Sequence, residues 1–352
     1  MFFYYIPIFV CLFSSFFVRK RVFSILLLFV VSFYLFFILS FKGNVDLDYD
    51  NYQMLLDASP YLSDGIIGLK KFAQYYNFEI GLVLLNSSLK SLNLSINAFF
   101  AFFAFFSIFS IYKITFNLKS CNKFLVFSLL YIFSFVGLWV QVRFGFACLV
   151  AFLSIICFFE KKLLFAFCFL LFAFCFHNIV SSIFIPVFMY IFLNKINFNK
   201  NYMLLLLCLF SLLIFVDFSF VLNIVMSFIN ARYEAYSIED VGSISSYFVR
   251  LVFFTFMLLL AKKDLRFESG IDRFLLSMAF CSVLIFIFAT QVTILYRIGV
   301  FFEFGYIFFL KRSSYNNQIN YIFSLLILIT LMIYRALVFD EVVKPYYSNF
   351  IG

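Results

Sequence analysis

The sequence is short of charge, of histidine and of tryptophan. Only 12% of its 352 residues are charged, about half the usual share of a soluble domain, whereas 66% are hydrophobic. A single histidine excludes a metal site built from several histidines, and the eight cysteines show no CxxC or Cys/His spacing. The basic residues are scattered between apolar blocks, so the net charge of +9 does not indicate a nucleic-acid partner. These absences leave an integral membrane protein as the class that fits.

The apolar residues fall in repeated blocks that are separated by short polar breaks. A membrane-spanning helix needs about 20 apolar residues, with about 17 to 25 tolerated. On this measure we predict an all-α polytopic protein with about twelve transmembrane helices in one integral membrane domain over residues 1–352. The blocks lie at approximately 2–18, 22–41, 95–116, 124–141, 144–159, 163–176, 178–193, 202–222, 246–261, 274–290, 298–310 and 319–337.

Lysine and arginine cluster in alternate breaks between these blocks. If the break at 19–21 is cytoplasmic, strict alternation places all the remaining basic clusters, such as the one at 262–273, on that same side. This is the positive-inside asymmetry of membrane proteins. Residues 80–94 would invert the scheme if they crossed the bilayer, so we expect a re-entrant or interfacial helix there. The outer face then carries two large loops, at about 42–94 and 223–245.

Ionisable residues at membrane depth are costly, so each is a candidate for function. In the predicted topology they gather at the outer ends of the helices, where Arg143 and Arg297 each lie beside polar residues. A guanidinium forms bidentate hydrogen bonds with phosphate oxygens, so we predict a phosphate-binding site. The alternative is that these arginines only reach for lipid headgroups. The other candidate substrate-binding residues are Arg232, Arg250, Tyr52, Tyr233, Tyr236 and Gln291.

Four residues are candidates for a catalytic base. His177 is the single histidine, and the unperturbed pKa of a histidine near neutrality suits proton transfer. The alternative is that His177 is a hydrogen-bonding residue that holds a helix turn. Asp48, Asp50 and Glu79 in the first outer loop are the other three candidates, because a carboxylate can also accept a proton.

Two further acidic features point to structure more than to chemistry. The DxDxD run that begins at Asp46 resembles the start of a calcium loop, but Asn51 stands where the turn glycine belongs. We therefore expect no metal ion and no soluble cofactor. Glu303 lies within an apolar helix, so we expect it to pair with another side chain inside the bundle.

Short motifs run through most of the chain in a characteristic order. They are DYDNY, FEIG at 78–81, QVRFGFA at 141–147, KKLLFAF to FCFHNIVSSIF at 161–184, ARYEAY at 231–236, ILYRIGVFFEF at 294–304 and KPYY at 344–347. Together they resemble the EpsG family of Wzy-type polymerases, which make O-antigen or capsular polysaccharide. In QVRFGFA, Phe144 stands where many members of that family have a glutamine after the arginine that corresponds to Arg143, so no role of that glutamine carries over.

The resemblance implies a GT-C-like membrane glycosyltransferase in the inner, cytoplasmic membrane with its active site facing the periplasm or exterior. Such an enzyme transfers a growing glycan from polyprenyl pyrophosphate onto a carrier-linked repeat unit, as in lipopolysaccharide synthesis. Its partners would be polyprenyl pyrophosphate-linked glycans, membrane lipid, a chain-length regulator and a flippase. A polysaccharide ligase and a lipid-linked glycan transporter are the alternatives. A transporter should show internal symmetry and polar residues on both sides of the midplane, which the sequence does not.

Overall fold

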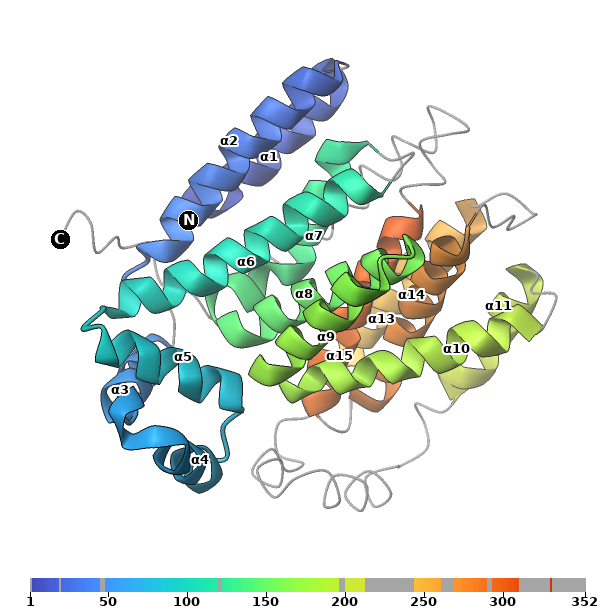
Figure 1. Ribbon diagram of the computed structural model, residues 1–352. Helices are drawn as coiled ribbons and strands as arrows, with labels where there is room; N and C mark the ends of the chain where they lie inside the picture. The colour runs from blue at the N-terminus through green and yellow to red at the C-terminus, as the bar shows by residue number, and fades with distance from the viewer. Residues whose placement is uncertain are drawn as a thin grey trace. The chain divides into compact units, whose positions relative to one another are not determined.

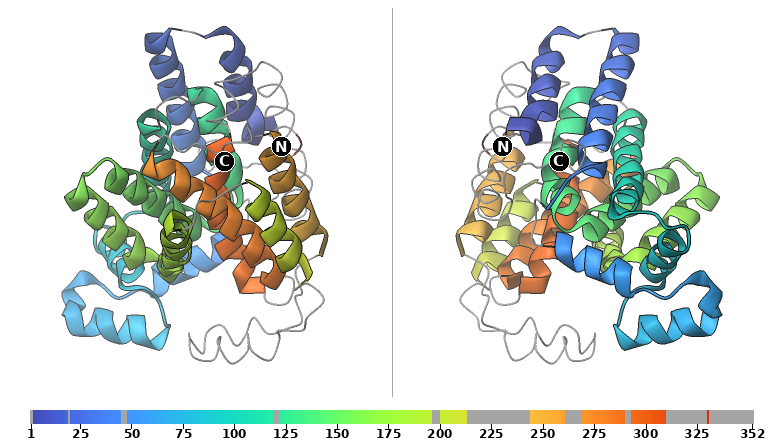
Figure 2. Two further views of the ribbon diagram at one scale, coloured as in Figure 1. Left: turned by 90° about the vertical axis from the view of Figure 1, so that its right-hand side faces the viewer. Right: turned by 90° about the vertical axis from the view of Figure 1, so that its left-hand side faces the viewer.

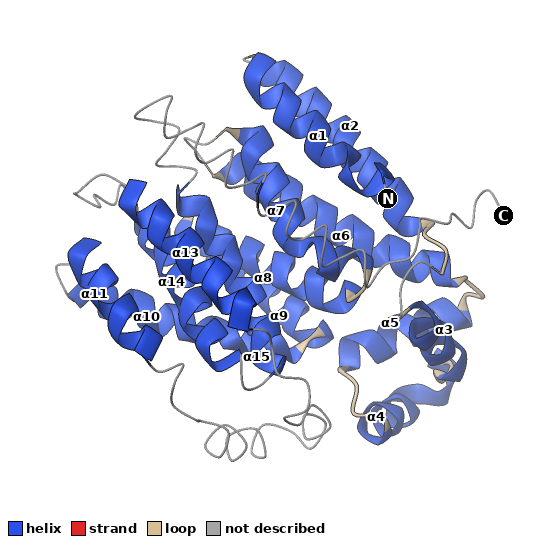
Figure 3. Cartoon of the chain, turned by 180° about the vertical axis from the view of Figure 1, so that it is seen from behind, coloured by secondary structure: helices blue, strands red, loops and turns tan. Residues whose placement is uncertain are grey.

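The computed structural model describes residues 2–18, 20–44, 48–118, 122–195, 200–212, 244–260, 269–289, 293–309 and 330. These residues form fourteen α-helices and three short 3₁₀ helices, with no β-strand among them (Figure 3). The predicted all-α class is confirmed for this part of the chain. Most of the last predicted block, at 319–337, and most of the loop at 223–245 lie outside it.

Several of the helices drawn in Figure 1 are strongly apolar in sequence. Four of those described are long and apolar enough to cross a membrane: α2 (Arg21–Ser40), α6 (Ile96–Asn117), α8 (Val142–Phe159) and α14 (Gly270–Ala289). Shorter apolar helices are α1 (Phe2–Phe17), α7 (Lys123–Trp139), α9 (Leu163–Phe176), α10 (Phe184–Lys195) and α13 (Ile244–Leu260). The protein is therefore a multi-pass membrane protein, and the number of about twelve spans stays a prediction.

The chain folds into two compact units that divide after Ser181. The first unit contains helices α1 to α9, including the short helices of the first predicted outer loop. The second unit contains α10, α11 (Lys200–Ser211), α13, α14, α15 (Thr293–Phe302) and the 3₁₀ helix η5 (Glu303–Tyr306). The single membrane domain expected from the sequence stays a prediction.

The core of the first unit is built around α7 and α8, in which almost every residue is buried. Helices α6 and α9 pack against α8. Gly137 on α7 and Gly145 on α8 let the two backbones touch, because a Cβ on Gly145 would lie 2.4 Å from the carbonyl carbon of Gly137. Small residues are the usual means by which membrane helices approach closely. This contact fixes the first turn of α8, which carries Arg143.

Three short helices follow α2 and group together at one end of the first unit (Figure 2): α3 (Tyr49–Ala58), α4 (Gly65–Tyr75) and α5 (Ile80–Ser91). Lys90 on α5 donates hydrogen bonds to the carbonyls of Asp57 at 2.5 Å and Ser59 at 2.6 Å, and so caps the end of α3. With 12 residues, α5 is shorter than the roughly 17 residues that a span needs.

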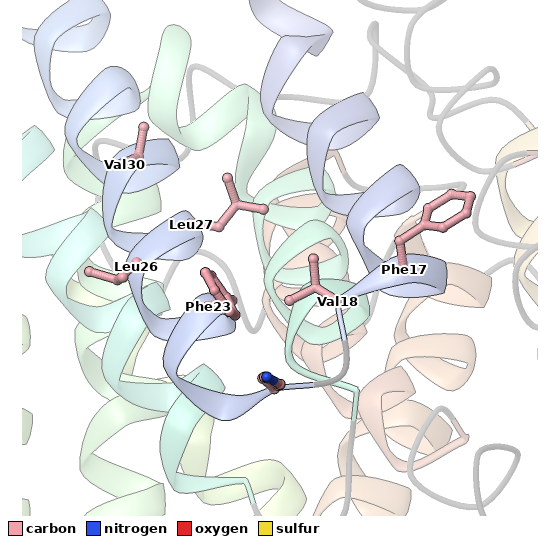
Figure 4. A pocket seen from close by; sticks show the side chains of 7 residues that line it. Phe17, Val18, Phe23, Leu26, Leu27 and Val30 are labelled. Carbon is pink, nitrogen blue, oxygen red and sulfur yellow. The ribbon is translucent and has the colours of Figure 1, made fainter.

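Helices α1 and α2 leave an apolar groove between their adjoining ends, which Figure 4 shows. Its walls are formed by aromatic and aliphatic side chains of both helices, and Lys20 contributes its one charged group. An open surface of this composition suits lipid acyl chains better than a polar substrate, which needs convergent polar groups. The polar groups of the first unit converge elsewhere.

Candidate functional site

Arg143 and Glu79 form an ion pair in the first unit. Nη1 of Arg143 lies 3.0 Å from Oε2 of Glu79, and the two side chains are 17% and 9% exposed. Arg143 belongs to the first turn of α8, and Glu79 immediately precedes α5. Among the described residues, the buried Nε of Arg143 has no hydrogen-bond partner. Because buried N–H groups normally find a partner, this donor is suited to a ligand.

A close contact between α5 and α9 brings Glu79 to this position. A Cβ on Gly81 would lie 2.6 Å from the carbonyl oxygen of Cys175, so only glycine permits the approach. Cys175 lies near the end of α9, and His177 is the C-cap residue of that helix. The contact therefore brings the start of α5, with Glu79, to the end of α9, with His177.

His177 lies at the same end of the α8 and α9 pair as Arg143. Its side chain is buried, and its ring meets the ring of Phe144 edge to face, with centroids 6.0 Å apart. The backbone N–H of Ile179 donates to Nδ1 of His177 at 3.1 Å. An imidazole that accepts at Nδ1 carries its proton on Nε2 when neutral, so Nε2 is a donor. The described contacts thus place His177 at the same end of α8 and α9 as the Arg143 and Glu79 pair, and we refer to these three residues as the cluster.

The other candidates of the first outer loop lie on or beside α3. Asp50 is exposed and accepts hydrogen bonds from Nδ2 of Asn44 at 3.0 and 3.2 Å, while Asp48 precedes the helix. Tyr52 is only 6% exposed, and its ring packs against Phe99 of α6 with centroids 5.1 Å apart. In this structure Tyr52 therefore attaches α3 to α6.

A second arginine–glutamate pair lies in the second unit. Nε of Arg250 is 2.6 Å from Oε1 of Glu303, and the side chains are 5% and 3% exposed. The guanidinium also lies over the ring of Phe286, 3.7 Å from its centroid, and 5.4 Å from that of Tyr296. The expectation that Glu303 pairs inside the bundle is confirmed. Arg297 follows Tyr296 on α15 and is half-buried.

Four candidate residues lie outside the described residues: Arg232, Tyr233, Tyr236 and Gln291. The same holds for Asp46, the first residue of the calcium-like run. Their roles stay predictions of the sequence. Within the part of the chain that the structure describes, no three His, Cys, Asp or Glu side chains group as metal ligands.

Lys42 is a residue near the site that sequence reasoning missed. Its side chain is fully buried, its ammonium donates to the carbonyl oxygen of Trp139, and it lies 4.4 Å from the ring centroid of Phe100. Trp139 ends α7, so Lys42 caps that helix just before the turn that leads to Arg143. The available signal was a lone lysine directly after an apolar span on the predicted outer side, against the positive-inside asymmetry.

These features define a multi-pass membrane protein whose first unit holds a cluster of one arginine, one glutamate and one histidine. A profile of the EpsG family matches residues 25–348. Because the match covers nearly the whole chain, the protein belongs to the EpsG family, and this membership implies a part in polysaccharide biosynthesis. Comparison with curated proteins and with solved structures finds no match.

Proposed function

We propose that the protein is a Wzy-type polysaccharide polymerase. It transfers a growing glycan from polyprenyl pyrophosphate onto a polyprenyl pyrophosphate-linked repeat unit at the outer face of the inner membrane. The observation that carries this proposal is the ion pair of Arg143 with Glu79. Arg143 also has a buried Nε without a partner among the described residues, which can donate to a ligand. The reaction needs cationic donors for a leaving diphosphate and a base for an acceptor hydroxyl, and this pair has both.

The reaction breaks one bond and forms another at the same carbon. A hydroxyl of the acceptor sugar attacks the anomeric carbon of the donor glycan, and the bond from that carbon to the diphosphate oxygen breaks. Polyprenyl diphosphate leaves with the bonding electrons, and Arg143 donates hydrogen bonds to its phosphate oxygens. Glu79 loses its ion-pair partner as the guanidinium turns to the diphosphate, and it accepts the proton of the hydroxyl.

His177 acts as a second donor in this proposal. Because Nδ1 accepts the Ile179 N–H, the neutral ring offers the Nε2 proton to a phosphate oxygen and has no free acceptor nitrogen for the hydroxyl proton. This favours Glu79 over His177 as the base. Asp48 and Asp50 are the remaining alternatives, and either would need the α3 segment to close over the site as a lid. Binding of the diphosphate by Arg297 stays a prediction of the sequence.

The test is polymerisation by the purified protein in lipid nanodiscs supplied with the carrier-linked repeat unit. We expect a ladder of products on a gel from the wild type and from Arg273→Ala, a control that removes a half-buried arginine of the second unit, hydrogen-bonded to Asn194. Arg143→Ala should form no ladder. A single glycan transfer to a lipid acceptor without a ladder would indicate a ligase, and movement of the carrier between leaflets without a new bond would indicate a transporter. Either result would overturn the proposal.

The proposed orientation has its own test at Ser63, which is exposed in the 3₁₀ helix before α4. In a Ser63→Cys variant, a membrane-impermeant thiol reagent should label the new cysteine from the periplasmic or exterior side of intact cells. The unmodified chain controls for its own eight cysteines. Labelling from the cytoplasmic side alone would place the first outer loop, and the cluster beside it, on the wrong side for the proposed reaction.

A further inference from the structure

A row of aromatic rings leads from the surface of the first unit to the Arg143 and Glu79 pair. Tyr75 and Tyr76 at the end of α4 are 82% and 46% exposed, with ring centroids 4.9 Å apart. The ring of Tyr76 lies nearly parallel to that of Phe78, at 6.2 Å and 12°. Phe78 in turn faces the guanidinium of Arg143, 5.6 Å from its ring centroid. An exposed aromatic surface is thus continuous with the candidate site.

The backbone holds these rings in place. Helix α4 ends at Tyr75, Asn77 two residues later has a left-handed φ of 51°, and the N–H of Phe78 donates to the carbonyl of Ala73 at 2.9 Å. This is the hydrogen-bonding pattern of a Schellman motif, which terminates a helix in a defined geometry. The ring of Phe72 also packs against Tyr76, with centroids 4.6 Å apart. The aromatic surface is therefore ordered before any ligand arrives, which lowers the entropic cost of binding.

The two ends of α4 expose different chemistry. Its N-terminal end exposes Ile66 and Ile67, 82% and 73% respectively, which offer only apolar contact and suit lipid. Its C-terminal end exposes Tyr75 and Tyr76, each with an apolar ring face and a hydroxyl. A pyranose ring matches the second kind of surface, because it has an apolar C–H face and a rim of hydroxyl groups. Lipid acyl chains have no donors or acceptors that could form hydrogen bonds with the phenol hydroxyls.

We infer that Tyr75 and Tyr76 form a carbohydrate-binding platform, supported by Phe78, that holds pyranose rings of the glycan beside the Arg143 and Glu79 pair. The inference rests on the proposed function for one point only, that the diphosphate of the glycan carrier binds at Arg143. A glycan attached to a diphosphate at that position extends over the neighbouring aromatic surface. Stacking uses ring faces that most pyranoses share, so the platform holds the chain while other contacts select the sugar.

The test measures binding of two separate probes by calorimetry to the full-length protein in nanodiscs. One probe is the water-soluble oligosaccharide released by mild acid from the carrier lipid of the source strain, and the other is inorganic pyrophosphate. The double variant Tyr75→Ala/Tyr76→Ala should weaken oligosaccharide binding about tenfold, as expected for two lost ring contacts, and leave pyrophosphate binding unchanged. Tyr76→Phe should keep most of the affinity. Ile66→Ala, an equally exposed position on the same helix, should leave both affinities unchanged.

The outcomes separate the platform from the proposed reaction. Unchanged oligosaccharide binding in the double tyrosine variant overturns the platform, whatever happens to polymerisation. If the wild-type protein makes no polymer and the double variant still binds the oligosaccharide more weakly than the wild type, the platform is supported and the polymerase is overturned instead.

A membrane anchor is the competing role for these two tyrosines. A fluorophore attached in a Tyr75→Cys variant should remain unquenched by nanodisc lipids that carry a spin label on the acyl chain. Quenching would place this end of α4 in lipid and would overturn the platform. The same label in an Ile66→Cys variant reports on the other end of the helix, where contact with lipid leaves the inference intact.

Discussion

The two units each contain an arginine–glutamate pair, and the pairs differ in how completely they are enclosed. In the first unit Arg143 and Glu79 are 17% and 9% exposed, and Nε of the arginine has no partner among the described residues. In the second unit Arg250 and Glu303 are 5% and 3% exposed, and Nε of the arginine donates to the glutamate at 2.6 Å. The second guanidinium also lies closer to an aromatic ring, 3.7 Å compared with 5.6 Å.

The comparison shows that residue type alone does not decide the role of a charged pair in a membrane protein. Removing two charges from water costs free energy. A buried pair whose donors and neighbours are all in place offsets that cost through its own contacts and needs no ligand, so it is suited to holding helices together. A pair that keeps a spare donor and some exposure can exchange partners with an incoming anion. We therefore expect the pair at Arg250 to determine stability and the pair at Arg143 to determine activity.

The largest expected effect is on stability, at the enclosed pair. Arg250→Ala leaves the Glu303 carboxylate buried without its counterion, which should cost about 3–5 kcal/mol. The thermal unfolding of the purified protein in detergent measures this loss. The double change Arg250→Met/Glu303→Leu removes both charges and should recover most of the stability. An unchanged melting temperature in Arg250→Ala would show that the second pair is not a structural contact.

The next effect is on activity, at the open pair. Arg143→Lys should lower the polymerisation rate about a hundredfold, because an ammonium cannot reproduce the planar fork of donors, and its melting temperature should stay near that of the wild type. Arg273→Lys, at a half-buried arginine of the second unit, is the matched control and should keep full activity. Polymer of normal length and rate from Arg143→Lys would remove this arginine from the site.

A smaller effect is expected at His177 and distinguishes a donor from a base. In His177→Asn the side-chain oxygen can still accept the N–H of Ile179, so the helix turn should persist while the Nε2 donor is lost. We expect the rate to fall roughly tenfold to a hundredfold, the usual range for one hydrogen bond to a charged group. A loss of about a thousandfold or more, with unchanged melting, would instead identify His177 as the base. Full activity would reduce His177 to a structural residue.

No effect is expected from metal removal. The proposed site meets the diphosphate charge with Arg143 and with the N–H of His177, so polymerisation in excess chelator should proceed at the rate measured without it. The rate with added Mg²⁺ provides the reference. Complete loss of activity in chelator that Mg²⁺ or Mn²⁺ restores would mean that a metal ion, and not the open pair, neutralises the diphosphate.

Much of the architecture was predictable, because hydrophobicity along a chain reports directly on which segments enter a bilayer. The apolar blocks predicted at 22–41, 95–116 and 144–159 correspond to α2, α6 and α8. Residues 80–94 contain α5, whose polar residue Lys90 proves to cap α3. The hydrophobic pattern of the chain could not show this, since the carbonyls that Lys90 binds lie at the end of a different helix.

The sequence offers the residues of the candidate site but not how they pair. Arg143, Glu79 and His177 are candidates because ionisable residues are rare in such a chain, but the sequence predicts Glu79 only as a possible base and not as the partner of Arg143. The sequence also offers Tyr52 as a candidate for sugar binding; its ring is buried against α6, and its role in binding stays a prediction. The sequence does not predict the exposed Tyr75 as a binding residue, because exposure at the end of a short helix has no signature in composition.

By itself, the sequence determined that this is an all-helical membrane protein and, through its ordered motifs, that it belongs to the EpsG family. The tertiary structure decided which charges meet, since Arg143 pairs with Glu79 from 64 positions away and Arg250 with Glu303 from 53. The physical reason is that such pairing depends on the close approach of helix backbones. Glycines such as Gly81 and Gly145 allow that approach, and hydrophobic patterning does not specify which helices they bring together.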